Sequence, residues 1–156
     1  MNSDALGAEA APFDPIRFFS GHTHSEGYFE KRGGQPSQRI TTETSGRMKD
    51  GVLYIEQDLK PEKGKPQHRS WQLRGGDGHT VSATANDIIG TAHGIIRGNM
   101  LQWSVHLALS PGNPLKNVRM TQYMYLQPDG RSLIIRSVIR KAGIVVAEVS
   151  EQFWKD

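Results

Sequence analysis

Two β-rich runs, 52–60 and 65–73, carry an acid, a base, a phenol and an indole. A turn with proline and glycine joins them, so the runs are expected to form a hairpin. Pairing the strands symmetrically about that turn places the carboxylate of Glu56 opposite the guanidinium of Arg69. Side chains alternate between the faces of a strand, so one face holds three such pairs. These pairs are Glu56 with Arg69, Tyr54 with Trp71, and Val52 with Leu73.

Three roles are open to the pair of Glu56 and Arg69 inside a barrel. It could bind a ligand carboxylate or carbonyl. It could act in catalysis, with Glu56 as general acid or base and Arg69 as its electrostatic partner. It could also be an ion pair that stiffens the wall, although desolvation offsets much of the attraction in a buried pair.

A second phenol and guanidinium, Tyr123 and Arg136, come from runs joined by the turn at Pro128. Counting back from this turn places Arg136 opposite Thr121, beside Tyr123 on the same face. Inside the barrel, these two side chains could orient the polar head of a ligand. The alternative is a solvated outer face, because Arg140 has the same alternation as Arg136.

The histidines form no recognisable metal motif. His22 and His24 have metal-like spacing, but no glutamate follows His24 by three or four residues, as a cupin would require. We interpret this pair as loop histidines, and His93 and His106 as surface residues. The sequence has no cysteine, which excludes disulfides, thiolate catalysis and Cys-ligated metals. Neither a metal nor a cofactor is expected.

Composition bounds the class of protein. A chain of 156 residues with 36% hydrophobic content is expected to form one domain with a substantial core. The net charge of +3 comes from scattered basic residues, not from a stripe with aromatic platforms, which argues against nucleic-acid binding. No run is long enough to span a membrane, and no signal peptide is visible, so a cytoplasmic protein is expected.

The elements that must position these residues are almost all strands. Residues 1–15 are expected to be an N-terminal arm, which a partner subunit in a homo-oligomer could order, and residues 16–156 a single domain. Asp14 and Pro15 mark the start of a short helix that plugs one end. Ten strands joined by short turns should form an all-β, antiparallel, up-and-down barrel of the calycin or lipocalin type. The expected strands are 25–31, 38–46, 52–60, 65–73, 79–86, 90–97, 100–110, 115–126, 132–140 and 144–154.

One register can be derived from a two-residue turn, Gly98–Asn99. It places Gly94 opposite Trp103, so that an aromatic ring covers exposed backbone. Trp103 is therefore expected to face the interior, while His93 and His106 face out. Asp87 lies at a strand end and is interpreted as a residue that holds a turn. The interior set is Ala92, Gly94, Trp103, Val105 and Leu107.

A set of short motifs runs along nearly the whole chain. They are 18–21 (FFSG), 26–27 (EG), 53–56 (LYIE), 69–71 (RSW), 87–94 (DIIGTAHG), 98–99 (GN), 123–125 (YMY), Arg136, 141–144 (KAGI) and Phe153. This set resembles a bacterial family known as domain of unknown function 3833. The resemblance implies a lipocalin-like fold and assigns no catalytic residue. Many members look exported or lipid-anchored, with an N-terminal signal and a lipidation cysteine. This chain shows neither, so a periplasmic carrier role is not transferred to it.

The sequence thus favours a barrel with an interior ligand cavity, and three hypotheses follow. The first is a protein that binds an apolar or amphipathic small molecule. The second is a cofactor-free isomerase, cyclase or lyase, in which Glu56, Arg69 and Tyr123 are catalytic. The third is a solid barrel that acts through its outer face or its N-terminal arm. The residues expected to bind the ligand are Tyr54, Glu56, Arg69, Trp71, Trp103, Tyr123 and Arg136.

Overall fold

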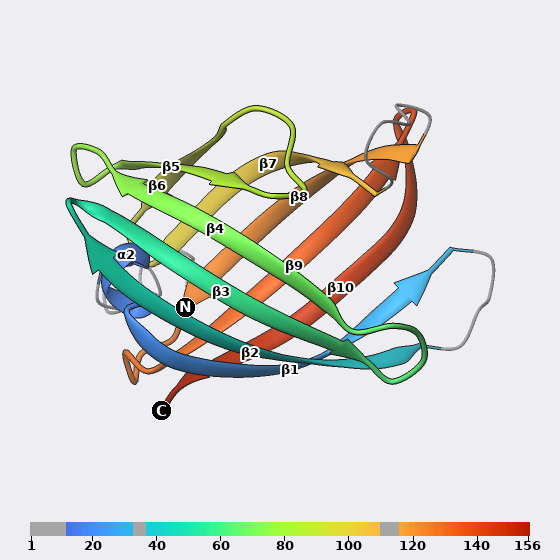
Figure 1. Ribbon diagram of the computed structural model, residues 1–156, viewed down its shortest axis with the longest axis horizontal. Helices are drawn as coiled ribbons and strands as arrows, with labels where there is room; N and C mark the ends of the chain where they lie inside the picture. Colours follow the sequence, from blue (N-terminus) through green and yellow to red (C-terminus); the bar gives the residue numbers. More distant parts are fainter. Residues whose placement is uncertain (1–11, 33–36, 110–115) are drawn as a thin grey trace, which may run out of the picture.

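The computed structural model is a closed barrel of ten antiparallel strands with one short helix at one end (Figure 1). It describes residues 12–32, 37–109 and 116–156. Strands that follow each other in the chain pair with each other, and β1 pairs with β10 to close the barrel. The predicted all-β, up-and-down architecture is therefore confirmed. The elements are α2 (Pro15–Phe18), β1 (Gly21–Lys31), β2 (Gln38–Lys49), β3 (Val52–Pro61), β4 (Gln67–Gly75), β5 (Thr80–Ala85), β6 (Ala92–Arg97), β7 (Met100–Ala108), β8 (Asn117–Leu126), β9 (Ser132–Lys141) and β10 (Ile144–Lys155).

Helix α2 closes one end of the barrel, as predicted. The side chain of Asp14 caps its first turn by accepting a hydrogen bond of 3.2 Å from the backbone N–H of Arg17. Phe18 and Phe19 are buried, and the ring of Phe19 packs edge-on against Phe153 of β10, 5.9 Å away. The plug is therefore held by an N-cap and by aromatic packing. Most of the expected N-terminal arm falls on residues 1–11, outside the described residues.

The last strand also holds the helix through a lysine. The ammonium group of Lys155 donates hydrogen bonds to the carbonyl oxygens of Arg17 at 3.1 Å, Phe18 at 2.7 Å and Ser20 at 3.0 Å. Carbonyls at the end of a helix have no partner within the helix, so a cation that accepts this geometry stabilises the end. One side chain of β10 thus fastens α2 to the barrel.

The β6–β7 register agrees with the sequence. Arg97 faces Met100 across the turn, as the two-residue loop predicts. A Cβ atom at Gly94 would lie 2.6 Å from the Cδ1 atom of Leu101 and 3.3 Å from the ring of Trp103. A glycine is therefore required for these side chains to lie over the backbone of β6. The predicted interior residues Ala92, Trp103, Val105 and Leu107 are all buried.

The β3–β4 register differs by one residue from the expected one. Arg69 faces Gln57 instead of Glu56. Pro66 supplies the reason, because it has no N–H to donate to the ladder, and pairing resumes only at Gln67. A shift of one residue exchanges the two faces of a strand, so Glu56 lies on the outer surface. The observed pairs are Leu53–Leu73, Tyr54–Gln72, Ile55–Trp71, Glu56–Ser70 and Gln57–Arg69.

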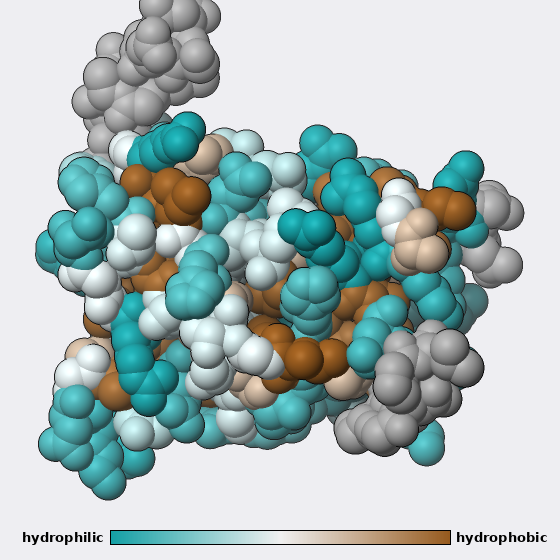
Figure 2. All heavy atoms as spheres, turned by 90° about the horizontal axis from the view of Figure 1, so that it is seen from above, coloured by the Kyte–Doolittle hydropathy of each residue, from teal (hydrophilic) through white to brown (hydrophobic). Residues whose placement is uncertain are grey.

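The interior of the barrel is apolar on most sides and polar on one. Leu53, Leu101 and Leu133 are completely buried, whereas β1 and β2 bury hydroxyl groups instead. On the outside, hydrophobic residues lie in separate patches between hydrophilic ones on the face shown in Figure 2. Among the described residues, no helix is both long and apolar enough to cross a membrane. The buried hydroxyl residues of β1 and β2 are Thr23, Ser25, Thr42 and Thr44.

Candidate functional site

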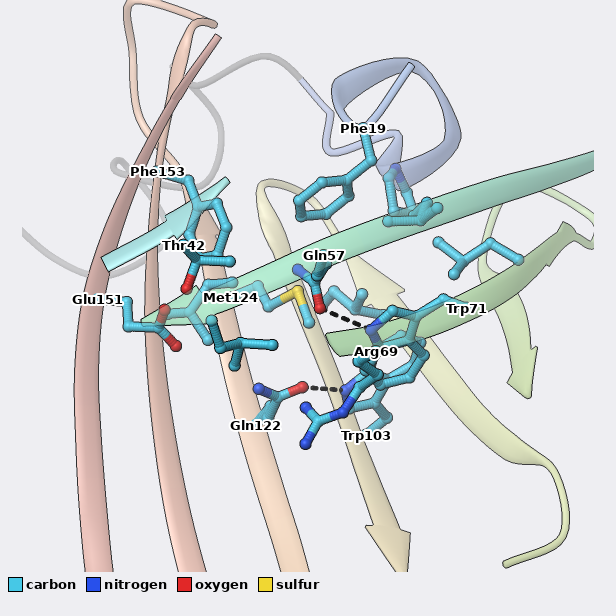
Figure 3. A pocket seen from close by; sticks show the side chains of 16 residues that line it. Phe19, Thr42, Gln57, Arg69, Trp71, Trp103, Gln122, Met124, Glu151 and Phe153 are labelled. Carbon is cyan, nitrogen blue, oxygen red and sulfur yellow. Dashed lines mark hydrogen bonds between the residues drawn. The ribbon is translucent and has the colours of Figure 1, made fainter. Parts of the chain in front are cut away.

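A cavity of about 60 Å³ lies inside the barrel (Figure 3). Its wall is mainly aromatic and aliphatic, but Gln57, Arg69, Gln122 and Glu151 also line it. The volume corresponds to about two water molecules at roughly 30 Å³ each. Pockets for drug-sized ligands are larger, roughly 300–1,000 Å³. The barrel is thus not solid, and its open space fits a small molecule or the head group of a larger one.

Two stacked tryptophans form one side of the cavity. The rings of Trp71 and Trp103 are nearly parallel, with centroids 5.6 Å apart and an angle of 9° between their planes. Each indole N–H donates to a glutamine oxygen, Trp71 to Gln57 at 2.7 Å and Trp103 to Gln122 at 2.8 Å (Figure 3). The amide of Gln122 in turn donates to the hydroxyl of Ser137 at 3.0 Å. The ring pair is therefore held in place, and its faces form a flat apolar surface.

Arg69 brings a positive charge to the cavity. Its Nε atom is 2.8 Å from the Oδ2 atom of Asp87, and its side chain is only 13% exposed. The guanidinium carbon lies 5.7 Å from the ring centroid of Trp71. Among the described residues, the terminal nitrogens of Arg69 donate no hydrogen bond. Asp87, interpreted from the sequence as a turn residue, is the counter-ion that orients this guanidinium.

A buried acid lies on the inner face of β10. Ser25 donates a hydrogen bond of 3.2 Å to Glu151 from the neighbouring strand β1. Burial raises the pKa of Glu151 above the ordinary value for glutamate, and the hydrogen bond from Ser25 and the charge of Arg69 oppose this only in part. The carboxyl group therefore keeps its proton to a higher pH than an exposed glutamate and can donate an O–H bond.

Replacing Glu151 with Gln should reduce the dependence of stability on pH. The folded pKa lies above the unfolded value of about 4.3, so wild-type stability falls as pH rises through that value toward the folded pKa. Glutamine cannot ionise, so Glu151→Gln should be more stable relative to wild type at about pH 8 than at about pH 4. Urea denaturation at both pH values measures the difference. Glu148→Gln, on the outer face of β10, is the control and should show no such gain.

One protein-family model, described as protein of unknown function (DUF3833), matches residues 1–155. The chain belongs to this family. The lipocalin-like barrel that the resemblance implied is the fold observed. No curated protein matches the chain.

Fourteen solved chains match the DUF3833 chain. One is the S-type phycobiliprotein lyase CPES from Guillardia theta, with a TM-score of 0.66 and 7% sequence identity over 90% of each chain. At this identity the likeness shows a shared barrel fold and nothing finer.

Three of the seven predicted ligand-binding residues of the DUF3833 chain line the cavity, namely Arg69, Trp71 and Trp103. Glu56 and Tyr54 do not, because the shifted register turns both outward. The carboxylate of Glu56 instead accepts hydrogen bonds from the hydroxyl of Ser70 at 2.6 Å and from the ring of His68 at 2.5 Å. These two bonds lower the pKa of Glu56, that of Ser70 having the larger effect.

Tyr123 and Arg136 lie together, but on the outside of the barrel. They face each other directly across β8 and β9, two residues away from the expected register. The inward positions of β8 belong to the neighbouring residues Gln122 and Met124, so Tyr123 and Arg136 must point outward. Arg136 donates a hydrogen bond of 3.2 Å to Glu148 and is largely exposed. The alternative of a solvated outer face is the correct one for this pair.

The sequence interpretation missed Glu151, Gln57, Gln122 and the pairing of Asp87 with Arg69. For Glu151 a local signal exists, because it alternates with apolar inward residues of β10. For Asp87 none exists, since a loop residue meets Arg69 only through the closed sheet. A polar residue on the apolar face of an alternating strand is the pattern that could have revealed the acid.

Proposed function

We propose that the barrel binds a small molecule with a carboxylate or carbonyl head and a flat apolar body, with Arg69 holding the head. The observation that supports this most directly is a nearly buried guanidinium whose terminal N–H groups have no acceptor among the described residues. Leaving buried donors without acceptors is costly, and a ligand oxygen would remove that cost.

The charges around the cavity favour an anionic head. Asp87 balances Arg69 from one side through Nε, which leaves the outer edge of the guanidinium for a second acceptor. Glu151, when protonated, adds a neutral donor rather than a second negative charge. A ligand carboxylate could then accept hydrogen bonds from both Arg69 and Glu151.

The apolar body would lie against the stacked rings of Trp71 and Trp103. The observed cavity takes only the head, so a longer body must displace side chains at its wall. Met124 and Leu59 line this wall, and an unbranched methionine side chain adapts its shape readily. The similar barrel of a phycobiliprotein lyase is compatible with a ligand in this position but does not choose one.

The test compares two ligands that differ only in the head, 2-naphthoate and 2-naphthamide, by quenching of tryptophan fluorescence. Wild type should prefer the carboxylate. Arg69→Met should bind the carboxylate at least about tenfold more weakly and lose the preference, since a hydrogen bond to a charged group contributes roughly 1.5–3 kcal/mol.

Arg136→Met is the matched control, because Arg136 is an arginine of the outer face. It should bind both ligands as wild type does. Arg69→Lys keeps the positive charge beside Asp87 and should retain part of the preference. Equal affinity of wild type and Arg69→Met for 2-naphthoate would refute the anchor. Native mass spectrometry of protein from its own host would then identify any co-purified molecule.

A second candidate is a cofactor-free isomerase, cyclase or lyase on the same barrel. Glu56 cannot act in the cavity from the outer face. Glu151 favours this candidate instead, because a buried acid with a raised pKa next to an arginine suits general acid catalysis. Glu151→Gln that keeps ligand affinity but loses turnover would support it. Recovery of every bound ligand unchanged from wild type would count against it.

A further inference from the structure

Two imidazoles and two carboxylates meet on the outer wall of the barrel, where β1 lies between β2 and β10. His22 and His24 are not in a loop, as the sequence suggested, but on β1, where their side chains share one face. Glu43 of β2 is directly opposite His24. The backbone N–H of Asp156 continues the β10 ladder by donating to the carbonyl oxygen of His22 at 3.1 Å. The closed sheet therefore brings together residues that are more than a hundred positions apart.

The donor atoms of this cluster converge. The Nε2 atom of His22 is 3.0 Å from a carboxylate oxygen of Glu43, and its Nδ1 atom is hydrogen-bonded to Asp156. One donor atom from each of His22, Glu43 and Asp156 lies within 4.8 Å of the others. Ligands around a tetrahedral zinc ion, at bonds of about 2.1 Å, are roughly 3.4 Å apart. A small contraction of the cluster would reach that geometry.

The fourth side chain is held in a supporting position. His24 contacts Asp156 through Nδ1 at 2.6 Å, and its ring stacks on Trp154 with centroids 5.3 Å apart. Partners that hold a metal-binding carboxylate in place commonly contribute to metal affinity. The two carboxylates of the cluster carry two negative charges, which match a divalent cation when the imidazoles are neutral.

We propose that His22, Glu43 and Asp156 bind one Zn²⁺ ion on the outer wall, with His24 as a positioning residue for Asp156. Imidazole nitrogen and carboxylate oxygen are ligands that zinc accepts, and the strand pairing fixes where they stand. Spacing along the sequence could not reveal this set, because only His22 and His24 are close in the chain. Binding would tie the end of β10 to β1 and β2.

The experiment uses the full-length chain without a histidine tag, freed of metal by a chelator, and titrates it with ZnCl₂ by calorimetry. Wild type should bind one equivalent, and Zn²⁺ should raise its Tm. Glu43→Gln preserves the size of the side chain and should weaken binding by at least about tenfold, as should His22→Ala.

His68→Ala is the matched control. His68 is about as exposed as His22 and also contacts two carboxylates, those of Glu56 and Asp58, but it belongs to no converging group of three donors among the described residues. It should bind Zn²⁺ as wild type does. No binding by wild type would overturn the proposal. Equal binding by wild type and Glu43→Gln, or a loss in His68→Ala alone, would overturn it as well.

Discussion

A single methyl group at residue 46 is expected to lower the free energy of unfolding by about 3–5 kcal/mol. The Cβ atom of Gly46→Ala would overlap the carbonyl oxygen of Phe19 and lie 2.9 Å from its carbonyl carbon. Backbone atoms cannot swing away as the end of a flexible side chain can, so β2 and the end of α2 would have to separate. Phe19 lines the cavity and packs on Phe153, so the aromatic plug would loosen with it.

Gly75→Ala is the control for this prediction. Gly75 also lies beside α2, but a Cβ atom there would be 3.9 Å from Ile16, an ordinary van der Waals contact. Alanine at this site should be neutral or stabilising by up to about 1 kcal/mol. Urea denaturation followed by far-ultraviolet circular dichroism measures both variants. Similar losses in Gly46→Ala and Gly75→Ala would show that the close approach at Gly46 is unimportant for stability.

Truncation of Trp103 to Ala should cost about 3–5 kcal/mol of stability. The side chain is 5% exposed, and it stacks on Trp71. Its loss would remove that contact and would leave the buried amide oxygen of Gln122 without its donor. The space left behind has the shape of an indole ring in an apolar setting, and cavities of this kind bind apolar molecules. Added indole should therefore raise the Tm of Trp103→Ala but not that of wild type.

Trp154→Ala is the matched control, because Trp154 lies on the outer face of β10 and stacks only on His24. Its cost should be about 1 kcal/mol, and indole should not restore it. Thermal and urea denaturation with and without indole provide the measurement. If Trp103→Ala costs no more than Trp154→Ala and gains nothing from indole, the ring pair is not part of the packed interior.

The sequence predicted registers correctly where a short turn dictates them. The two residues Gly98 and Asn99 leave one way to pair β6 with β7, and the structure has that pairing. The loop before Gln67 is longer, and Pro66 decides where the ladder resumes. One residue there turned Glu56 from an expected cavity acid into a surface carboxylate. Registers across long loops depend on tertiary packing, which a single sequence does not contain.

The candidate site was predictable only in its apolar part. Trp71 and Trp103 follow from alternation on strands whose apolar faces are clear. Glu151 was missed because a glutamate reads as exposed unless its strand neighbours on the same face are considered. The pairing of Asp87 with Arg69 depends on how a loop folds over the barrel wall. Polar groups that a closed sheet gathers inside it need coordinates before they can be matched.

The ladder between β1 and β10 affects how the chain can fold as the ribosome makes it. Thr23 pairs with Lys155, so the first strand waits for the last one to leave the exit tunnel. Until then β1 presents an unpaired edge, a surface that other nascent chains can join. Contacts between such distant segments also slow the search for the native state. The closed cylinder therefore forms after synthesis of the final strand, and its nascent chain is most vulnerable to aggregation just before that point.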